Sequence, residues 1–203
     1  QFWLREIIAR KLIKANGVFG LFPAVSSGDD VLILDEAKTG SVKTVFSFLR
    51  NQEQKEKGVP NLCLADYVAP ESSGLTDWAG AFVVTAALGD DVLKSYGDDD
   101  YASIMIRILS DRIAEAAAEY LHERVRKEYW GYAAGEELTT EELLKNRYRG
   151  IRPAPGYPAC PDHTEKRIIF ELLEAERNTG AGLTENFVMI PPAAVCAYIF
   201  SHP

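Results

Sequence analysis

Apolar residues in the first fifteen positions recur at the spacing of an amphipathic helix. Asn16 and Gly17 follow them, a pair typical of a helix C-terminus. We therefore predict a helix over residues 1–15. Its apolar face consists of Phe2, Ile7, Ile8, Leu12 and Ile13.

Beyond residue 17 the pattern changes to short apolar runs of strand length. The runs at 18–25 and 31–37 are joined by the turn sequence Ser-Ser-Gly-Asp-Asp, and a third run follows at 44–50, which predicts hairpins. Residues 51–60 are polar and predict an exposed loop. The other predicted strands are 63–68 (CLADYV), 79–88 (AGAFVVTAAL) and 194–200 (AVCAYIF), with a turn over 70–77.

Residues 101–130 return to a helical period and predict the longest helix of the chain. A Thr-x-x-Glu signature in TTEELLKNRY predicts a short capped helix, and a further helix begins near Thr164 and is stopped by Gly180. Because strands and helices come in runs, we expect an α+β fold with a mainly antiparallel sheet and packed helices. The predicted buried side of the long helix consists of Ile104, Met105, Ile108, Leu109, Ile113, Ala116, Ala117, Tyr120 and Leu121.

Length and composition fit one domain, since the chain has 203 residues of which 47% are hydrophobic. The net charge of −8 disfavours a nucleic-acid partner. No run reaches the roughly 20 apolar residues that span a bilayer, so we expect a cytoplasmic protein without a membrane partner. Three cysteines without CxxC spacing indicate reduced thiols rather than a disulfide framework or a metal site. The chain opens inside a predicted helix and stops after a strand-like run, so we expect residues 1–203 to be one domain that is incomplete at both ends.

The segment 150–163 (GIRPAPGYPACPDH) stands out because it has four prolines around a central glycine. Proline fixes its own φ and biases its predecessor to extended conformations, so a preformed loop is expected. Arg152 offers a forked cation to a carboxylate, the carbonyl of Ala154 can accept from an adenine amino group, and Tyr157 adds an aromatic face. From composition alone, a rigid connector whose arginine pairs with a structural acid is the better interpretation.

The stretch RPAPGYPACPDHTEK within and after this segment resembles the signature of the reactivation domain of cobalamin-dependent methionine synthases, almost residue for residue. The resemblance extends to GVFGLFPA, CLADYVAPESSGLTDWAGAFVVTA, DRIAEAAAEYLHERVRKEYWGY and LTENFVMIPPAAVCAYIFSHP, and so covers essentially the whole chain. It implies a C-shaped single domain with a twisted antiparallel sheet that binds S-adenosylmethionine.

The same resemblance assigns roles to particular residues. Arg152 is expected to hold the methionine carboxylate, backbone groups of Ala154 and Gly156 to meet the adenine, and Tyr157 to pack beside the ligand. Glu115, on the long helix, is also implied at the ligand site. Asp111 on that helix faces the neighbouring cobalamin domain in the family, and the acidic cluster around Asp90 is a second candidate for such a contact. His122 we assign to a solvated helix face.

The implied activity is reactivation: S-adenosylmethionine remethylates oxidised cobalamin with an electron from flavodoxin or a related flavoprotein. No catalytic acid, base or nucleophile is implied in this chain. The family also implies that cobalamin and zinc are bound by other domains of the same polypeptide. The competing hypothesis is a non-catalytic module that docks a cobalamin domain or a flavodoxin-like reductase without presenting S-adenosylmethionine. A lone internal carboxylate on Arg152, without a cavity beside Tyr157, would favour docking.

Overall fold

The computed structural model describes residues 2–38, 40–89, 91–92, 94–96 and 99–202. Its main sheet has five antiparallel strands in the order β3-β2-β1-β4-β7. The long pair β1 and β4 forms the centre and is in register from Ile13 opposite Leu88 to Ala24 opposite Asp77. The strands are β1 (Ile13–Ser27), β2 (Asp30–Leu34), β3 (Val42–Ser47), β4 (Asp77–Leu88) and β7 (Ala194–Ile199), and a separate two-stranded sheet pairs β5 (Gly182–Leu183) with β6 (Met189–Ile190).

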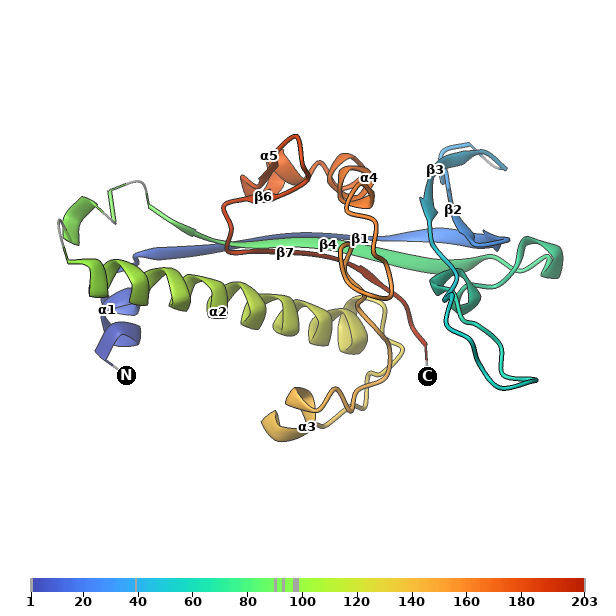
Figure 1. Cartoon of the computed structure of the whole chain (residues 1–203), viewed down its shortest axis with the longest axis horizontal. Coiled ribbons are helices and arrows are strands. Elements are labelled where there is room, and N and C mark those ends of the chain that lie inside the picture. The colour runs from blue at the N-terminus through green and yellow to red at the C-terminus, as the bar shows by residue number, and fades with distance from the viewer. Residues whose placement is uncertain (1, 39, 90, 93, 97–98, 203) are drawn as a thin grey trace.

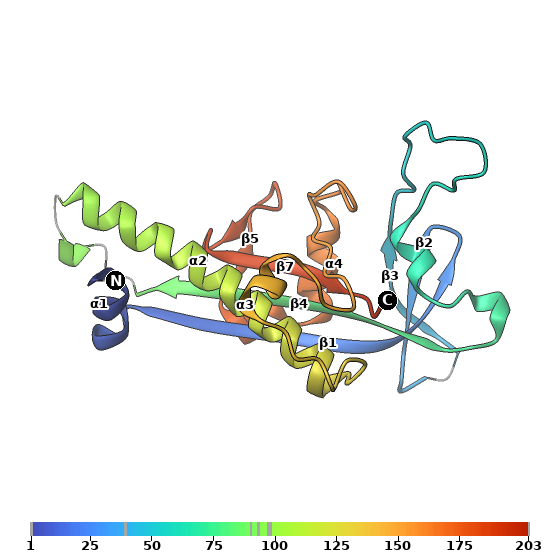
Figure 2. The same cartoon turned by 90° about the horizontal axis from the view of Figure 1, so that it is seen from below.

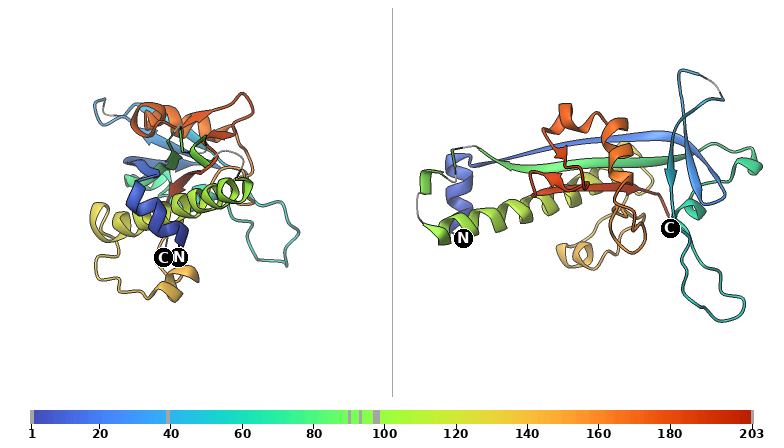
Figure 3. Two further views of the ribbon diagram at one scale, coloured as in Figure 1. Left: turned by 90° about the vertical axis from the view of Figure 1, so that its left-hand side faces the viewer. Right: turned by 45° about the horizontal axis from the view of Figure 1, so that its top comes forward.

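Helices cover both faces of this sheet in an elongated molecule (Figure 1). The long helix α2 (Asp100–Arg124) runs along one face, while α4 (Glu165–Leu172) and α5 (Ala175–Thr179) lie on the opposite face. The view from below shows α2 crossing β1 and β4 obliquely (Figure 2), and two further directions show the same layering (Figure 3). The shorter helices α1 (Phe2–Arg10) and α3 (Thr140–Leu144) lie near opposite ends of α2.

Coverage on both faces explains why β4 reads as an almost continuous apolar run, since every residue from Ala79 to Ala86 is buried. One core cluster lies between the sheet and α4, with Phe46, Ile169 and Tyr198 at its centre. A second lies between the sheet and α2 around Phe82, and two smaller clusters pack around Ile106 and Ala114 of the same helix. The predicted α+β class and mainly antiparallel sheet are confirmed.

Small side chains let α2 approach the sheet closely. Its buried stripe repeats every four residues, and Ser110 donates its hydroxyl hydrogen to the carbonyl of Ala86 in β4. Asp99 caps the helix by accepting from the backbone of Ala102 at 3.0 Å. After Arg124 the chain continues through one π-helical turn, Val125–Tyr129. The buried stripe consists of Ala102, Ile106, Ser110, Ala114, Ala118 and His122.

Several sequence predictions are confirmed at the level of single elements. The hairpin of β1, β2 and β3, the strands β4 and β7 and the exposed loop over 51–60 are present. The predicted capping box of α3 forms, with Thr139 Oγ1 accepting from the backbone of Glu142 at 3.3 Å and the Glu142 carboxylate accepting from the Thr139 backbone at 2.9 Å. All three cysteines are buried free thiols.

The first helix was predicted too long, because it ends at Arg10 and the chain enters β1 at Ile13. Lys11 takes a left-handed conformation with φ of 52° at this transition. Gly17, read as a helix stop, lies within β1, where an added Cβ would lie 3.0 Å from Cγ1 of Val84. The glycine is explained by close packing on β4 rather than by a turn.

Three further predictions were wrong or incomplete. CLADYV forms a 3-10 turn over Leu64–Tyr67 rather than a strand, since Asp66 accepts from the backbone of Cys63 at 2.8 Å. The helix expected from Thr164 to Gly180 is divided into α4 and α5 at Glu174, which has a φ of 46°. The buried face of α2 was predicted incorrectly, because alanines and His122 rather than the largest apolar residues face the sheet. Four residues that were predicted to be buried are exposed, namely Ile104, Ile108, Ala116 and Tyr120.

Candidate functional site

A groove of about 1240 Å³ lies alongside α2. One wall is the face of α2 from Asp111 to Glu123, and the other is formed by residues 152–154 and Tyr157. Residues of α3 also line the groove. The start of β7 contributes further lining, and small residues there leave the space open. This volume is sufficient for a ligand of nucleoside size. The small residues that line it are Ala114, Ala116, Ala154, Ala193, Ala194 and Ala197.

Backbone hydrogen bonds hold the segment that forms the second wall against the edge of β7. Ile151 and Phe200 exchange backbone bonds of 2.9 and 3.0 Å, and the carbonyl of Pro153 accepts from the backbone of Tyr198 at 2.9 Å. Gly156 then turns the chain with a φ of 97°, a conformation that favours glycine. The preformed loop predicted from the prolines is therefore present, and it extends the sheet edge toward the groove.

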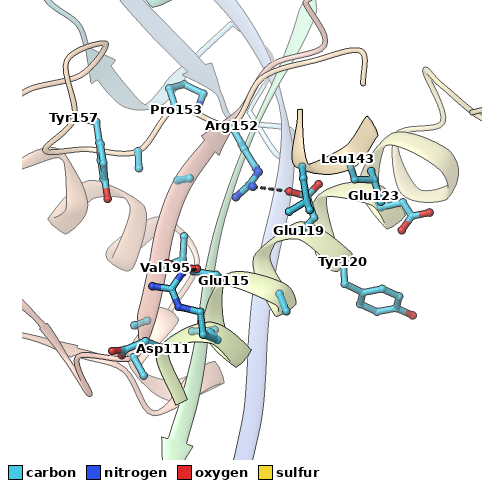
Figure 4. A pocket seen from close by; sticks show the side chains of 18 of the residues that line it. Asp111, Glu115, Glu119, Tyr120, Glu123, Leu143, Arg152, Pro153, Tyr157 and Val195 are labelled. Carbon is cyan, nitrogen blue, oxygen red and sulfur yellow. Dashed lines mark hydrogen bonds and ion pairs between the residues drawn. The ribbon is translucent and has the colours of Figure 1, made fainter. Parts of the chain in front are cut away.

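Arg152 points from this loop toward α2 (Figure 4). Its Nη2 donates to Oε2 of Glu119 at 2.6 Å, and its Nε donates to the hydroxyl of Tyr148 at 3.4 Å. Burial alone would lower the pKa of Arg152, but the bonds to Tyr148 and Glu119 raise it above the usual value, so the guanidinium stays charged. A fixed cation thus lies at the groove wall.

The other predicted site residues differ in their surroundings. Ala154 and Tyr157 line the groove, and the Tyr157 side chain is exposed. Glu115 also lines it and accepts from Nη1 of Arg112 at 2.6 Å. Asp111 lines the end of the groove nearer the start of α2.

Gly156 does not line the groove, because its α-carbon faces the ring of His163. An added Cβ would lie 2.3 Å from Cε1 of that histidine. Its backbone N–H donates to the carbonyl of Cys160 at 2.7 Å. Gly156 therefore shapes the loop beside the groove. Asp90 falls outside the described residues.

A buried polar network behind Arg152 was missed from the sequence. Arg126, in the π-helical turn, is fully buried, and it donates to both carboxylate oxygens of Glu136 from Nε at 3.2 and 3.1 Å and to one of them from Nη2 at 2.6 Å. Its guanidinium carbon lies 4.2 Å from the ring centroid of Tyr148. Glu119, His122 and Arg126 are spaced by three and four residues, which is the signal that could have indicated one helix face.

His122 was predicted to be solvated, and this was wrong, because its side chain is fully buried beside Arg126. Arg126 can only donate, so Nδ1 of His122 accepts at 3.0 Å and its hydrogen resides on Nε2. Burial lowers the pKa of His122 to about 3, assisted by the charges of Arg126 and Arg152. The imidazole is therefore neutral at physiological pH.

This neutral histidine predicts a loss of stability in mild acid. Above pH 6.5 it is neutral in both states, but below that pH the unfolded chain takes up a proton that the folded chain refuses until about pH 3. The free energy of unfolding should fall by about 1.4 kcal/mol per pH unit well below the unfolded pKa. Urea unfolding of the wild type and His122→Gln at pH 7.5 and 5.5 measures this, because titration of Glu165, whose pKa burial raises, is common to both proteins. An equal change in the free energy of unfolding in the two proteins between these pH values would contradict a buried, neutral His122.

The fold and groove define a class of protein: an α+β domain in which an arginine at a sheet edge points toward a helix beside an open groove large enough for a small molecule. The family described as "Vitamin B12 dependent methionine synthase, activation domain" matches residues 1–203. The chain therefore belongs to the activation-domain family of vitamin B12-dependent methionine synthases.

A solved structure supports the same assignment. The chain is similar to the protein in "Crystal Structure of the MetH Reactivation Domain bound to AdoHcy", with a TM-score of 0.93 and 52% sequence identity. The match covers 98% of this chain and 62% of that one, so this chain spans less than two thirds of its relative. Among the described residues, no helix is long and apolar enough to cross a membrane.

Proposed function

We infer that this chain binds S-adenosylmethionine in the groove beside α2 and presents its methyl group for reductive remethylation of oxidised cobalamin. The observation that carries this is the position of Arg152 and Ala154 on one wall of a groove whose other wall carries Glu115. The 52% identical relative, whose structure contains S-adenosylhomocysteine, supports the choice of ligand.

The described residues fit such a ligand. Arg152 matches the methionine carboxylate, since its Nη1 has no hydrogen-bond partner among the residues that the structure describes. Backbone groups near Ala154 would meet the adenine, with Tyr157 beside it and Glu115 across the groove, while Gly156 shapes the loop that presents them. S-adenosylmethionine supplies a methyl group already activated by the sulfonium, so the protein acts by binding and orienting it, without a general base.

The proposal includes partners outside this chain. We propose that residues 1–203 form a reactivation domain within a longer methyltransferase that also carries a cobalamin domain. That domain binds cobalamin, and Asp111 at the groove end is proposed to contact it. The electron comes from flavodoxin or a related flavoprotein. We propose a cytoplasmic location, where the buried thiols stay reduced.

Calorimetric titration with S-adenosylmethionine and S-adenosylhomocysteine tests the ligand assignment directly, using this chain and a version extended at both ends. Saturable binding of both ligands with one site per chain is expected, and ATP serves as a control nucleotide without an amino-acid group. No binding of either ligand to either version would overturn the assignment and favour a module that only docks a cobalamin domain or a reductase.

A further inference from the structure

Arg152 is held along one edge of its guanidinium, the edge formed by Nε and Nη2. Two of its five N–H bonds are used, one from Nε to Tyr148 and one from Nη2 to Glu119. Both hydrogens of Nη1 and the second hydrogen of Nη2 remain for a forked contact with a ligand carboxylate. A ligand can therefore bind Arg152 without displacing Glu119.

Glu119 is placed unusually for a surface-helix glutamate. One of its oxygens, Oε2, accepts from Arg152, while Oε1 is buried and accepts no hydrogen bond from the residues that the structure describes. Oε1 lies 3.9 Å from Nη1 of Arg126. The carboxylate thus lies between a groove arginine and a fully buried one, and its partly buried charge is stabilised by both cations.

Arg126 is itself immobilised on its other sides. Glu136 accepts from its Nε and Nη2, neutral His122 accepts from its Nη1, and Tyr148 stacks against its guanidinium. Because these contacts hold the guanidinium of Arg126 in place, its charge favours one position of the Glu119 carboxylate. Tyr148 contacts both arginines and so belongs to the same rigid support.

We propose that Glu119, supported by the buried Arg126, is a positioning residue that sets the orientation of Arg152 for the carboxylate of the ligand. This rests on the proposed function, because it assumes that Arg152 binds that carboxylate. Glu119 does not contact the ligand in this account. Tyr148 performs the same task more weakly through its longer bond to Nε.

The test compares S-adenosylmethionine with decarboxylated S-adenosylmethionine, which keeps the adenosine, sulfonium and amine and lacks only the carboxylate. Calorimetry on Glu119→Gln should show about tenfold weaker binding of S-adenosylmethionine, the scale of one charge-assisted hydrogen bond. Binding of the decarboxylated ligand should stay within about twofold of wild type, since a positioning effect on Arg152 is felt only through the carboxylate. Tyr148→Phe should show the same selective loss, smaller in size.

Glu128→Gln is the matched control, because this residue lies in the π-helical turn after α2, pairs with Arg124 and is not among the residues that line the groove. It removes the same charge from the same continuous helical segment and should change the affinity for neither ligand. Equal weakening of both ligands by Glu119→Gln would show a general structural role and overturn the proposal. Unchanged or tighter S-adenosylmethionine binding, with Arg152→Ala still defective, would show that Glu119 is inert or competes for Arg152. Failure of wild type to bind either ligand would instead reject the proposed function.

Discussion

Replacing Arg152 with alanine is expected to weaken S-adenosylmethionine binding by about 100-fold or more, which corresponds to roughly 3 kcal/mol. Two effects add in this variant. The ligand carboxylate loses its forked cation. Glu119 loses the donor at 2.6 Å, so less of its negative charge is compensated in the same region. Titration calorimetry on wild type and variant measures the difference.

Lysine at position 152 should bind with intermediate affinity, because an ammonium supplies charge without the planar fork. Arg149→Ala is the matched control, since Arg149 lies three residues earlier and donates to the carbonyl of Tyr132 outside the groove. Its affinity should equal that of wild type. Comparable losses in Arg149→Ala and Arg152→Ala would contradict a specific carboxylate contact.

Replacing Arg126 with methionine should lower the free energy of unfolding by about 3–5 kcal/mol, the usual cost of removing one partner of a buried ion pair. Glu136 would remain in the interior without its cation, and the partly buried Glu119 would keep Arg152 but lose its second cationic neighbour. His122 would also lose its donor to Nδ1. Urea unfolding followed by circular dichroism measures the change.

Two comparison variants make this result specific to the buried network. Arg124→Met removes a neighbouring, partly exposed arginine that pairs with Glu128, and it should cost no more than about 1 kcal/mol. The double variant Arg126→Met with Glu136→Gln should be more stable than Arg126→Met alone, because no buried carboxylate at position 136 is left uncompensated. Equal losses in Arg124→Met and Arg126→Met would show that the network does not stabilise the fold.

The sequence allowed the groove loop to be predicted because proline and glycine act locally. The prolines of 150–163 restrict the backbone regardless of tertiary context, and Gly156 has the positive φ expected of a turn glycine. Hairpin turns and the Thr139 cap are local in the same sense. These features could therefore be predicted correctly without knowledge of the tertiary packing.

Features that depend on tertiary packing could not be predicted from the local sequence. Gly17 looked like a helix stop, although its role is to leave room for Val84 on the neighbouring strand β4, which is distant in sequence. The buried face of α2 was misassigned because the helix lies close to the sheet, which selects Ala114 and Ala118 over larger apolar residues. Glu119 was overlooked because its significance depends on Arg126, whose burial no local pattern reveals.

The central claim, that Arg152 anchors the amino-acid end of S-adenosylmethionine in the groove beside α2, is tested most directly by a crystal structure of the protein with S-adenosylhomocysteine. The account predicts the ligand carboxylate about 2.7–2.9 Å from Nη1 of Arg152. It also predicts that the Arg152–Glu119 bond is retained and that the adenine lies along residues 153–157. A ligand bound outside this groove, or one whose carboxylate points away from Arg152, would contradict it.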